Sequence, residues 1–193
     1  MRLWTTLKKE IILDHNKFLK IEQHTIKLPD GTIIHDWPWV VSPDYVLVLP
    51  VTAQRNILLF HQTKYAVHGT SLAPIGGYLE QDEDPLSAAQ RELREEMGCE
   101  SPEWISLGSY PNNGNHGGGK GHLFLAFNTH HVGKPLSDDL EEMELIELTI
   151  QEVEKKLFQG EVKVMGWVAM IAIGLLYLSK KGTDEKSICF PIK

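Results

Sequence analysis

The stretch from Gly77 to Cys99 constrains the fold of this chain more than any other part of the sequence. It reads GYLEQDEDPLSAAQRELREEMGC, and its second half has the marks of a helix. Asp84 can cap the first free N–H groups, Pro85 suits the first helical position, and Gly98 suits the residue that follows a helix. We therefore predict a helix over residues 85–97.

The predicted helix has an apolar face and an acidic flank beside it. At about 100° per residue, the apolar face consists of Leu86, Ala89, Leu93 and Met97, and the flank consists of Glu92, Glu95 and Glu96. Carboxylates within one turn repel one another in a partly desolvated site, so a positive charge is expected among them. A divalent cation that takes hard oxygen ligands, Mg²⁺ or Mn²⁺, meets this need. The alternative is an ordinary acidic helix face exposed to solvent.

The spacing of the polar residues favours the cation site over the solvated face. The stretch resembles the Nudix box, G-x5-E-x7-R-E-U-x-E-E-x-G-U with U a bulky aliphatic residue, and it matches at every fixed position except the last. There the chain has Cys99, an apolar replacement that we expect to change packing more than chemistry. The resemblance extends less tightly over most of residues 10–180, where it is similar to the ADP-ribose pyrophosphatases of the Nudix superfamily.

The resemblance implies a role for each fixed residue of the box. The implied metal ligands are Glu92, Glu96, Glu95 and the backbone carbonyl of Gly76. The implied structural residues are Gly77, Glu83, Arg91 and Gly98. Glu83 and Arg91 are expected to pair and to hold the preceding loop against the helix, and Gly77 is expected to adopt a backbone conformation closed to other residues.

The reaction implied by the resemblance is hydrolysis of a nucleoside diphosphate linked to a second group. The best candidate is ADP-ribose, cleaved to AMP and ribose 5-phosphate, with Mg²⁺ neutralising the phosphate oxygens and lowering the pKa of water. The implied catalytic candidates are Glu141, Asp139 and Glu142 on a late acidic loop, one of them the general base, and Glu95 in the box. A solvated acidic turn is the alternative for the loop.

Several alternatives to ADP-ribose stay open at this point. Other nucleotide sugars, dinucleotides and nucleoside triphosphates are possible substrates, because loops rather than the box set the pocket. A nucleotide-binding Nudix module without catalysis is a further class. Such modules commonly lose metal carboxylates, whereas this chain has Glu92, Glu95 and Glu96.

Five residues outside the box are candidates for contact with the substrate: Trp37, Trp39, Lys64, Pro111 and Lys120. The two tryptophans lie where the relatives place a segment that reaches the site of a partner subunit, and they could stack on the base. The alternative is that they pack in a dimer interface or in the core. Lys64 could contact a phosphate, and the alternative is a solvated lysine.

Two other patterns are interpreted as structural. Residues 114–121 contain G-x4-G-K, the start of a phosphate-binding P-loop, but Gly121 replaces the Ser or Thr of that motif and no helix is expected to follow. We therefore predict a mobile loop over the active site rather than a P-loop nucleotidase that depends on Lys120. Four histidines lack the spacing of a zinc site: His116, His122, His130 and His131.

The composition of the chain bears on its cellular compartment and on its possible partners. The net charge of −7 argues against nucleic acid and anionic membranes as partners. Two cysteines and the lack of a recognisable secretory leader favour a cytoplasmic protein. Residues 164–179 carry no charge, but a membrane span needs about 20 apolar residues, so we predict a buried helix.

The expected fold is α+β, a mixed β-sheet sandwiched between helices as in the Nudix fold. Residues 1–45 should form an N-terminal antiparallel β segment that mediates a homodimer, residues 46–182 the hydrolase domain, and residues 183–193 a tail. A capping box at residues 149–152 should begin a short helix that ends near Gly160. Strands are predicted at 11–13, 18–28, 32–34, 45–51, 57–60, 104–110, 122–127 and 143–148.

Overall fold

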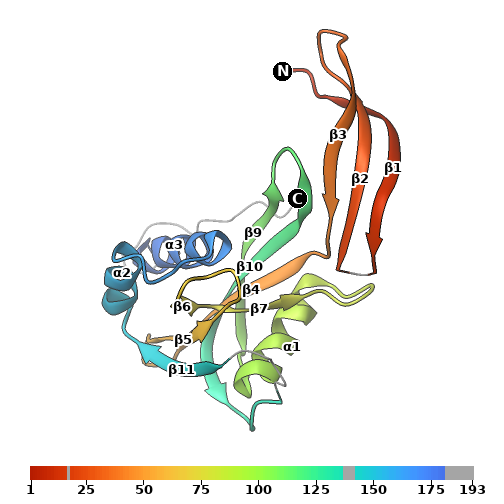
Figure 1. Ribbon diagram of the computed structural model, residues 1–193. Coiled ribbons are helices and arrows are strands. Elements are labelled where there is room, and N and C mark those ends of the chain that lie inside the picture. Colours follow the sequence, from red (N-terminus) through yellow and green to blue (C-terminus); the bar gives the residue numbers. More distant parts are fainter. Residues whose placement is uncertain (17, 137–141, 181–193) are drawn as a thin grey trace. The chain divides into compact units, whose positions relative to one another are not determined.

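The computed structural model describes residues 1–16, 18–136 and 142–180 (Figure 1). The strands are β1 (Thr5–His15), β2 (Leu19–Lys27), β3 (Ile33–Val41), β4 (Tyr45–Thr52), β5 (Ile57–Thr63), β6 (Thr70–Ala73), β7 (Ile75–Tyr78), β8 (Cys99–Glu100), β9 (Glu103–Asn113), β10 (Gly117–His131) and β11 (Met143–Leu148). The helices are α1 (Pro85–Met97), α2 (Ile150–Phe158) and α3 (Met165–Lys180). The chain forms two compact units, residues 1–44 with 110–121 and residues 45–109 with the described part of 122–193.

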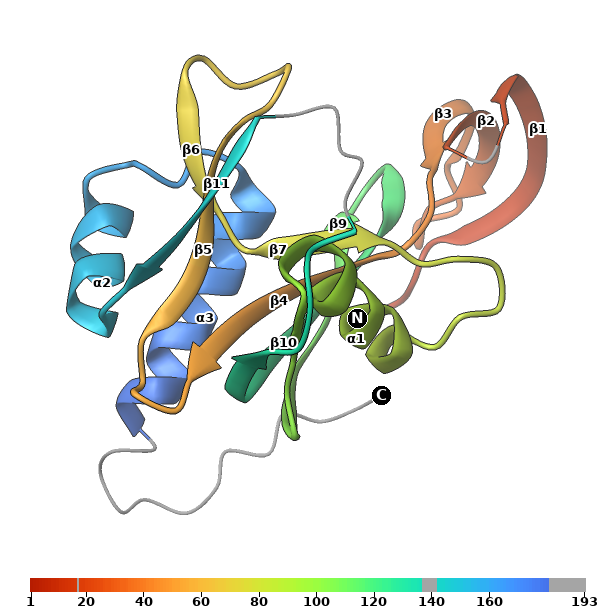
Figure 2. The same cartoon turned by 90° about the horizontal axis from the view of Figure 1, so that it is seen from below.

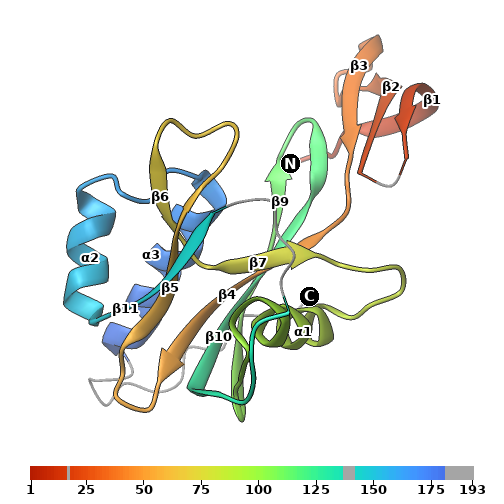
Figure 3. The same ribbon diagram turned by 60° about the horizontal axis from the view of Figure 1, so that its bottom comes forward.

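The larger unit is built on a sheet with the strand order β10-β4-β5-β11. Alternate residues of β4 and β5 pack on opposite faces: Val46, Val48, Leu58 and Phe60 contact the α1 side, and Leu47, Leu49, Ile57 and Leu59 contact the α3 side. Both faces are therefore covered, which explains why these strands are nearly continuous apolar runs in the sequence. Figures 2 and 3 show α1 on one side of the sheet and α2 with α3 on the other. The predicted α+β sandwich is confirmed.

Two short strands that the sequence did not indicate fill the gap where β4 and β5 diverge. β6 pairs with β5, with Ala73 opposite Phe60, and β7 pairs with β4, with Ile75 opposite Val48. The chain thus runs antiparallel to β5 as β6 and, after Pro74, antiparallel to β4 as β7. The pairing of β7 with β4 places Gly77, the first residue of the box, opposite Val46.

Helix α1 begins and ends as its capping residues predict. The Asp84 side chain accepts hydrogen bonds from the backbone N–H groups of Leu86 and Ser87, and Gly98 ends the helix in a left-handed conformation with φ 61°. The predicted apolar face is wrong at one residue, because Leu86 is 38% exposed. The buried arc is rotated toward Ala88 and Glu92, so Leu86 lies at its rim.

Helices α2 and α3 occupy the other face of the sheet. The predicted capping box of α2 is present, with Thr149 and Glu152 bonded reciprocally. Helix α3 buries only one side, where Gly174 approaches Leu49, and Leu176 on its other side is 62% exposed. The prediction of a buried helix is therefore only partly correct. Within the described ranges, no helix has the length and apolar character that a membrane span requires.

The smaller unit is an antiparallel sheet of β1, β2 and β3, joined by the start of β10. Gly117 of β10 pairs in parallel with Val40 of β3. A Cβ on Gly117 would lie 2.6 Å from the Trp39 ring, so glycine permits this close approach. The predicted loop over residues 114–121 is too long, because only residues 114–116 form a turn and β10 begins at Gly117.

Candidate active site

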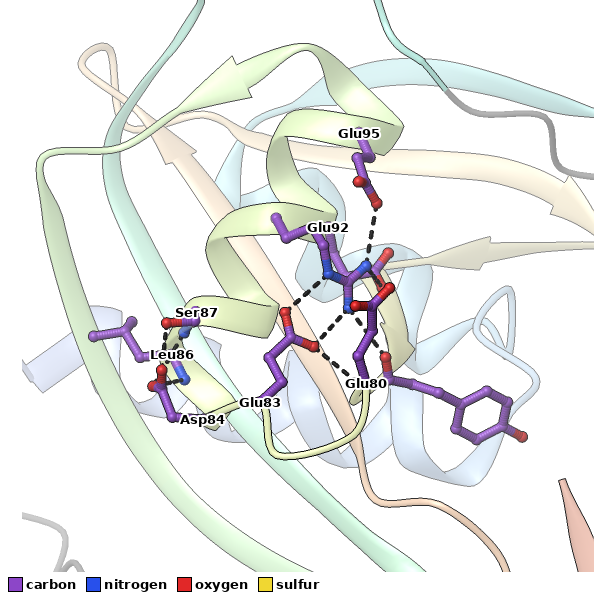
Figure 4. Close-up of polar contacts among 9 residues, drawn as sticks. Glu80, Glu83, Asp84, Leu86, Ser87, Glu92 and Glu95 are labelled. Atoms are coloured by element: carbon purple, nitrogen blue, oxygen red, sulfur yellow. Dashed lines mark hydrogen bonds and ion pairs between the residues drawn. The ribbon is translucent and has the colours of Figure 1, made fainter. Parts of the chain in front are cut away.

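Arg91 is the centre of the hydrogen-bond network on α1. Its Nε and Nη2 donate to the two carboxylate oxygens of Glu83, each at 2.9 Å. Its Nη1 donates to Glu92 at 2.7 Å and to Glu95 at 3.1 Å, and Nη2 also donates to the Tyr78 carbonyl at 3.1 Å. A guanidinium has five N–H donors, so every one of them is used. Figure 4 shows the labelled Glu83, Glu92 and Glu95 converging on one guanidinium.

The bidentate pair of Glu83 and Arg91 ties the loop before α1 to the helix. Glu83 also accepts a hydrogen bond from the backbone N–H of Glu80 at 2.9 Å, which closes the loop on itself. Hydrogen bonds from Arg91 lower the pKa of the Glu83 carboxyl below its usual value, and the same bonds raise the pKa of Arg91. The structure therefore brings together two residues that the box assigns to a structural role.

This pair gives stability a defined dependence on pH. Because the pKa of Glu83 is lower in the folded protein, the ionised carboxylate stabilises the fold above its unfolded pKa of about 4.5 and loses that effect as the pH falls through the folded pKa. We expect the Tm difference between wild type and Glu83→Gln to be largest above about pH 5 and to shrink toward pH 3. Thermal unfolding of both proteins from pH 3 to pH 7 measures this. The matched control is Glu80→Gln, an exposed side chain in the same loop, and a Glu83 difference that is constant with pH would contradict the assignment.

Gly77 is required for close approach to Glu92 rather than for its backbone conformation. A Cβ at Gly77 would lie 1.9 Å from the nearer Glu92 carboxylate oxygen. The φ of Gly77 lies outside the left-handed region, so the expectation of a conformation closed to other residues is wrong. The Glu92 side chain, 10% exposed, therefore rests in a space that only glycine leaves.

The carboxylates of α1 supply the kind of donors that a hard divalent cation takes. Glu83, Glu92 and Glu95 share a single guanidinium, and Glu96 follows on the same helix, so negative charge exceeds positive charge here. Glu92 and Glu95 are turned toward Arg91, and among the described residues no three His, Cys, Asp or Glu side chains are already arranged around a common metal position. Oxygen donors, excess negative charge and the burial of Glu92 nevertheless fit Mg²⁺ or Mn²⁺.

Of the three acidic-loop candidates for the general base, only Glu142 lies in the described part of the chain. Glu141 and Asp139 lie outside the described residues. Glu142 is exposed and immediately precedes β11, which pairs with β5 through Met143 opposite Gln62. Glu142 thus directly precedes the residue that pairs with the end of β5.

The predicted substrate contacts are divided between the two units. Lys64 is half-buried in the larger unit, whereas Trp37, Trp39, Pro111 and Lys120 belong to the smaller one. Within the smaller unit, Trp37 donates from Nε1 to the Asn115 carbonyl at 2.8 Å and stacks on His116, with 5.2 Å between ring centroids. Trp39 stacks on His24, also at 5.2 Å. Each indole thus has one face in contact with a histidine, which favours a packing role for that face.

Lys120 and Pro111 are both exposed in the smaller unit. The backbone N–H of Lys120 donates to the Asp44 carboxylate at 2.8 Å. Residues 114–116 form the turn between β9 and β10, and Lys120 lies within β10, so this segment is not the strand-to-helix turn of a P-loop.

The histidines considered for zinc have other neighbours. His122 contacts Ser109 at 2.7 Å, and His131 lies 3.6 Å from the Cys99 sulfur. Cys99 is fully buried among the apolar residues that contact α1, and burial raises the pKa of its thiol. Cys99 therefore fills the aliphatic position of the box as an apolar side chain.

One functional group of the network could not have been found from the sequence. The Tyr78 carbonyl completes the set of acceptors around Arg91, but a backbone acceptor leaves no mark on the choice of side chain. Its position follows from the pairing of β7 with β4, which the sequence did not indicate.

A sheet between helices, with a box helix whose carboxylates surround one arginine, defines a class of enzyme, and a family comparison identifies it. The model of the NUDIX domain matches residues 41–168, which is more than half of the chain. The chain therefore belongs to the Nudix family, and it is a Nudix hydrolase. Enzymes of this family generally use divalent metal ions.

Two relatives and one solved structure are similar to this chain over most of its length. The chain is 29% identical over 168 residues to a methanol dehydrogenase activator of Bacillus methanolicus, covering 82% of this chain and 88% of the relative. It is 27% identical over 178 residues to an ADP-ribose pyrophosphatase of Bacillus subtilis (strain 168), covering 91% and 92%. A crystal structure of an ADP compounds hydrolase has the same fold, with a TM-score of 0.77 over 94% of this chain and 97% of that one at 16% identity.

Proposed function

We propose that this protein hydrolyses the pyrophosphate bond of ADP-ribose in the presence of Mg²⁺, giving AMP and ribose 5-phosphate. The observation that carries the proposal is the set of α1 carboxylates, held by Arg91 beside Gly77 in a box that matches the family at every fixed position but the last. Similarity to an ADP-ribose pyrophosphatase over most of both chains supports the choice of substrate.

The residues that would hold the metal are Glu92, Glu96, Glu95 and the carbonyl of Gly76. When bound, Mg²⁺ supplies charge neutralisation for the diphosphate oxygens and makes attacking water more acidic. Arg91 sets the direction of the Glu92 and Glu95 carboxylates through Nη1, and Glu83 fixes Arg91 through a two-point contact. Because Glu92 and Glu95 are bonded to Arg91 rather than arranged around a common metal position, we expect their carboxylates to turn toward Mg²⁺ when it binds.

The proton of the attacking water must be removed as its oxygen bonds to phosphorus and the bridging P–O bond breaks. We assign this step to Glu141, with Asp139 and Glu142 as the alternatives. Support comes from the alternative Glu142, which directly precedes β11, the strand that pairs with β5 in the larger unit.

The N-terminal segment supports a homodimer. Every residue of β1 is exposed, including four large apolar side chains with exposures of 48% to 61%: Leu7, Ile11, Ile12 and Leu13. Monomeric proteins rarely leave such a patch in water, so we propose that a second copy covers it. Light scattering on the purified chain measures the mass in solution, and a monomer would contradict this part of the proposal.

The decisive assay is the release of AMP from ADP-ribose with Mg²⁺. We expect turnover that EDTA abolishes and that Mg²⁺ or Mn²⁺ restores. A parallel panel of another nucleotide sugar, NADH, a diadenosine polyphosphate and a nucleoside triphosphate ranks the alternative substrates by kcat/KM. Binding without turnover across the whole panel would favour a non-catalytic nucleotide-binding module instead.

A further inference from the structure

Helices α2 and α3 lie side by side on one face of the sheet and leave an open groove between them (Figure 2). The groove has a volume of about 370 Å³ and lies within the larger unit. Most of the side chains that line it are apolar, three from each helix: Ile150, Leu157, Phe158, Ala172, Leu175 and Leu176. The groove is thus a concave apolar surface that is separate from the carboxylates of α1.

The groove exposes large apolar side chains to water. Phe158 is 84% exposed and Leu176 is 62% exposed. Apolar side chains gathered around a groove between two helices are typical of a surface that binds another apolar segment. We propose that this groove binds residues 188–192 of the same chain. The proposal is independent of the reaction assigned to α1.

Residues 188–192 have the chemistry that the groove requires. Residues 181–193 lie outside the described part of the chain, and their sequence is KGTDEKSICFPIK. The segment ICFPI carries no charge and contains three large apolar residues, Ile188, Phe190 and Ile192. The seven residues before it, KGTDEKS, are polar or glycine, which is typical of a solvated connection. Burial of the apolar segment against the apolar groove removes both surfaces from water, which is favourable.

The connection is long enough to bring residues 188–192 to any part of the groove. Ser179 lines the groove, and α3 ends one residue later at Lys180. From Ser179 back to Ala172 the groove follows α3 for about 10 Å, at a rise of about 1.5 Å per residue. The seven residues 181–187 span up to about 23 Å when extended. The chain therefore leaves α3 at one end of the groove with enough length to turn back along it.

A tethered segment has an advantage over a second copy of the chain as the occupant. A short flexible connection gives an effective concentration on the order of millimolar, whereas a separate protein molecule in dilute solution is far less concentrated. The ordering cost of a short connection grows only slowly with its length. Because α3 delivers the segment directly beside the groove, a weak apolar contact is enough for binding within one chain.

The test is a disulfide crosslink between Cys189 and a cysteine introduced on α2. Cys99, the other cysteine of the chain, is fully buried and does not compete. In Glu154→Cys the new thiol lines the groove, whereas in the matched control Lys155→Cys it points about 100° away on the same helix. We expect mild oxidation to join position 154 to Cys189 within one chain at least about tenfold faster than position 155, because docking raises the local thiol concentration. Mass spectrometry of the digested protein identifies the linked residues.

Two further substitutions test whether the apolar segment is responsible. Phe190→Ser in the Glu154→Cys chain should lower the crosslinking rate to that of the control, and Lys186→Ser, a change in the polar connection, should leave it unaltered. In the otherwise wild-type chain, Phe190→Ser should lower Tm by about 2–4 °C and Lys186→Ser by less than about 1 °C. Equal crosslinking rates at positions 154 and 155, or a Tm that Phe190→Ser leaves unchanged, would overturn the proposal. A crosslink found only between two chains would also overturn it and would assign the groove to a second copy.

Discussion

Glu96→Gln is expected to lower kcat for diphosphate hydrolysis by about a thousandfold or more, which corresponds to about 4 kcal/mol of transition-state stabilisation. The substitution keeps the size of the side chain and removes the charge that a divalent cation needs. Glu96 is only half-buried on α1, so the fold should tolerate the change. Steady-state kinetics with ADP-ribose at saturating Mg²⁺ measure the loss, and a Tm within about 3 °C of wild type shows that the fold is retained.

The matched control for this prediction is Glu100→Gln. Glu100 is an exposed carboxylate on β8, paired with Arg94 at 3.0 Å and outside the Arg91 network. An exposed pair contributes little, so we expect this variant to keep wild-type activity and stability. If Glu96→Gln cleaves every diphosphate ester of the panel as fast as wild type, the metal assignment on α1 is wrong.

Gly77→Ala is expected to lower kcat/KM about a hundredfold without unfolding the protein. The added Cβ would meet the Glu92 carboxylate at 1.9 to 2.5 Å, so that carboxylate must leave its position beside Arg91. A side-chain end can move, and overpacking of this kind costs about 1–3 kcal/mol of stability. A displacement of about 1 Å at a catalytic group is enough to cost two orders of magnitude in rate.

Gly133→Ala provides the comparison for Gly77→Ala. A Cβ at Gly133 would meet nothing within 4 Å, and its φ is not in the left-handed region, so the same chemical change should be nearly silent. Kinetics and thermal unfolding of the two variants separate displacement of Glu92 from a general effect of adding a methyl group. Wild-type kcat/KM in Gly77→Ala would show that the position of the Glu92 carboxylate does not limit the reaction.

Local signals in the sequence were sufficient to predict both ends of α1 and the start of α2. Asp84, Pro85 and Gly98 define α1 within one stretch, and Thr149 with Glu152 defines the start of α2. These residues act on the backbone within a few positions of themselves, so no knowledge of the remaining fold is needed to interpret them. The positions of β4 and β5 along the chain followed from apolar runs that a sheet covered on both faces requires.

Features that depend on distant parts of the chain were not predictable in the same way. Gly77 looked like a residue chosen for its backbone, but the reason for glycine is the Glu92 carboxylate, which is fifteen positions away in the sequence. The glycines from 117 to 119 suggested a loop, yet they permit a strand to approach Trp39 and Pro43 closely.

The complete use of the Arg91 guanidinium limits how the enzyme can diversify. Because each N–H already has an acceptor, a change at Glu83, Glu92 or Glu95 leaves a donor unmatched, and none of these positions can be adjusted alone to suit a new substrate. Two chains with identical boxes can therefore differ entirely in what they cleave. Differences in substrate range must come from residues outside the box, and a search for the natural substrate should compare those residues rather than the motif that identifies the family.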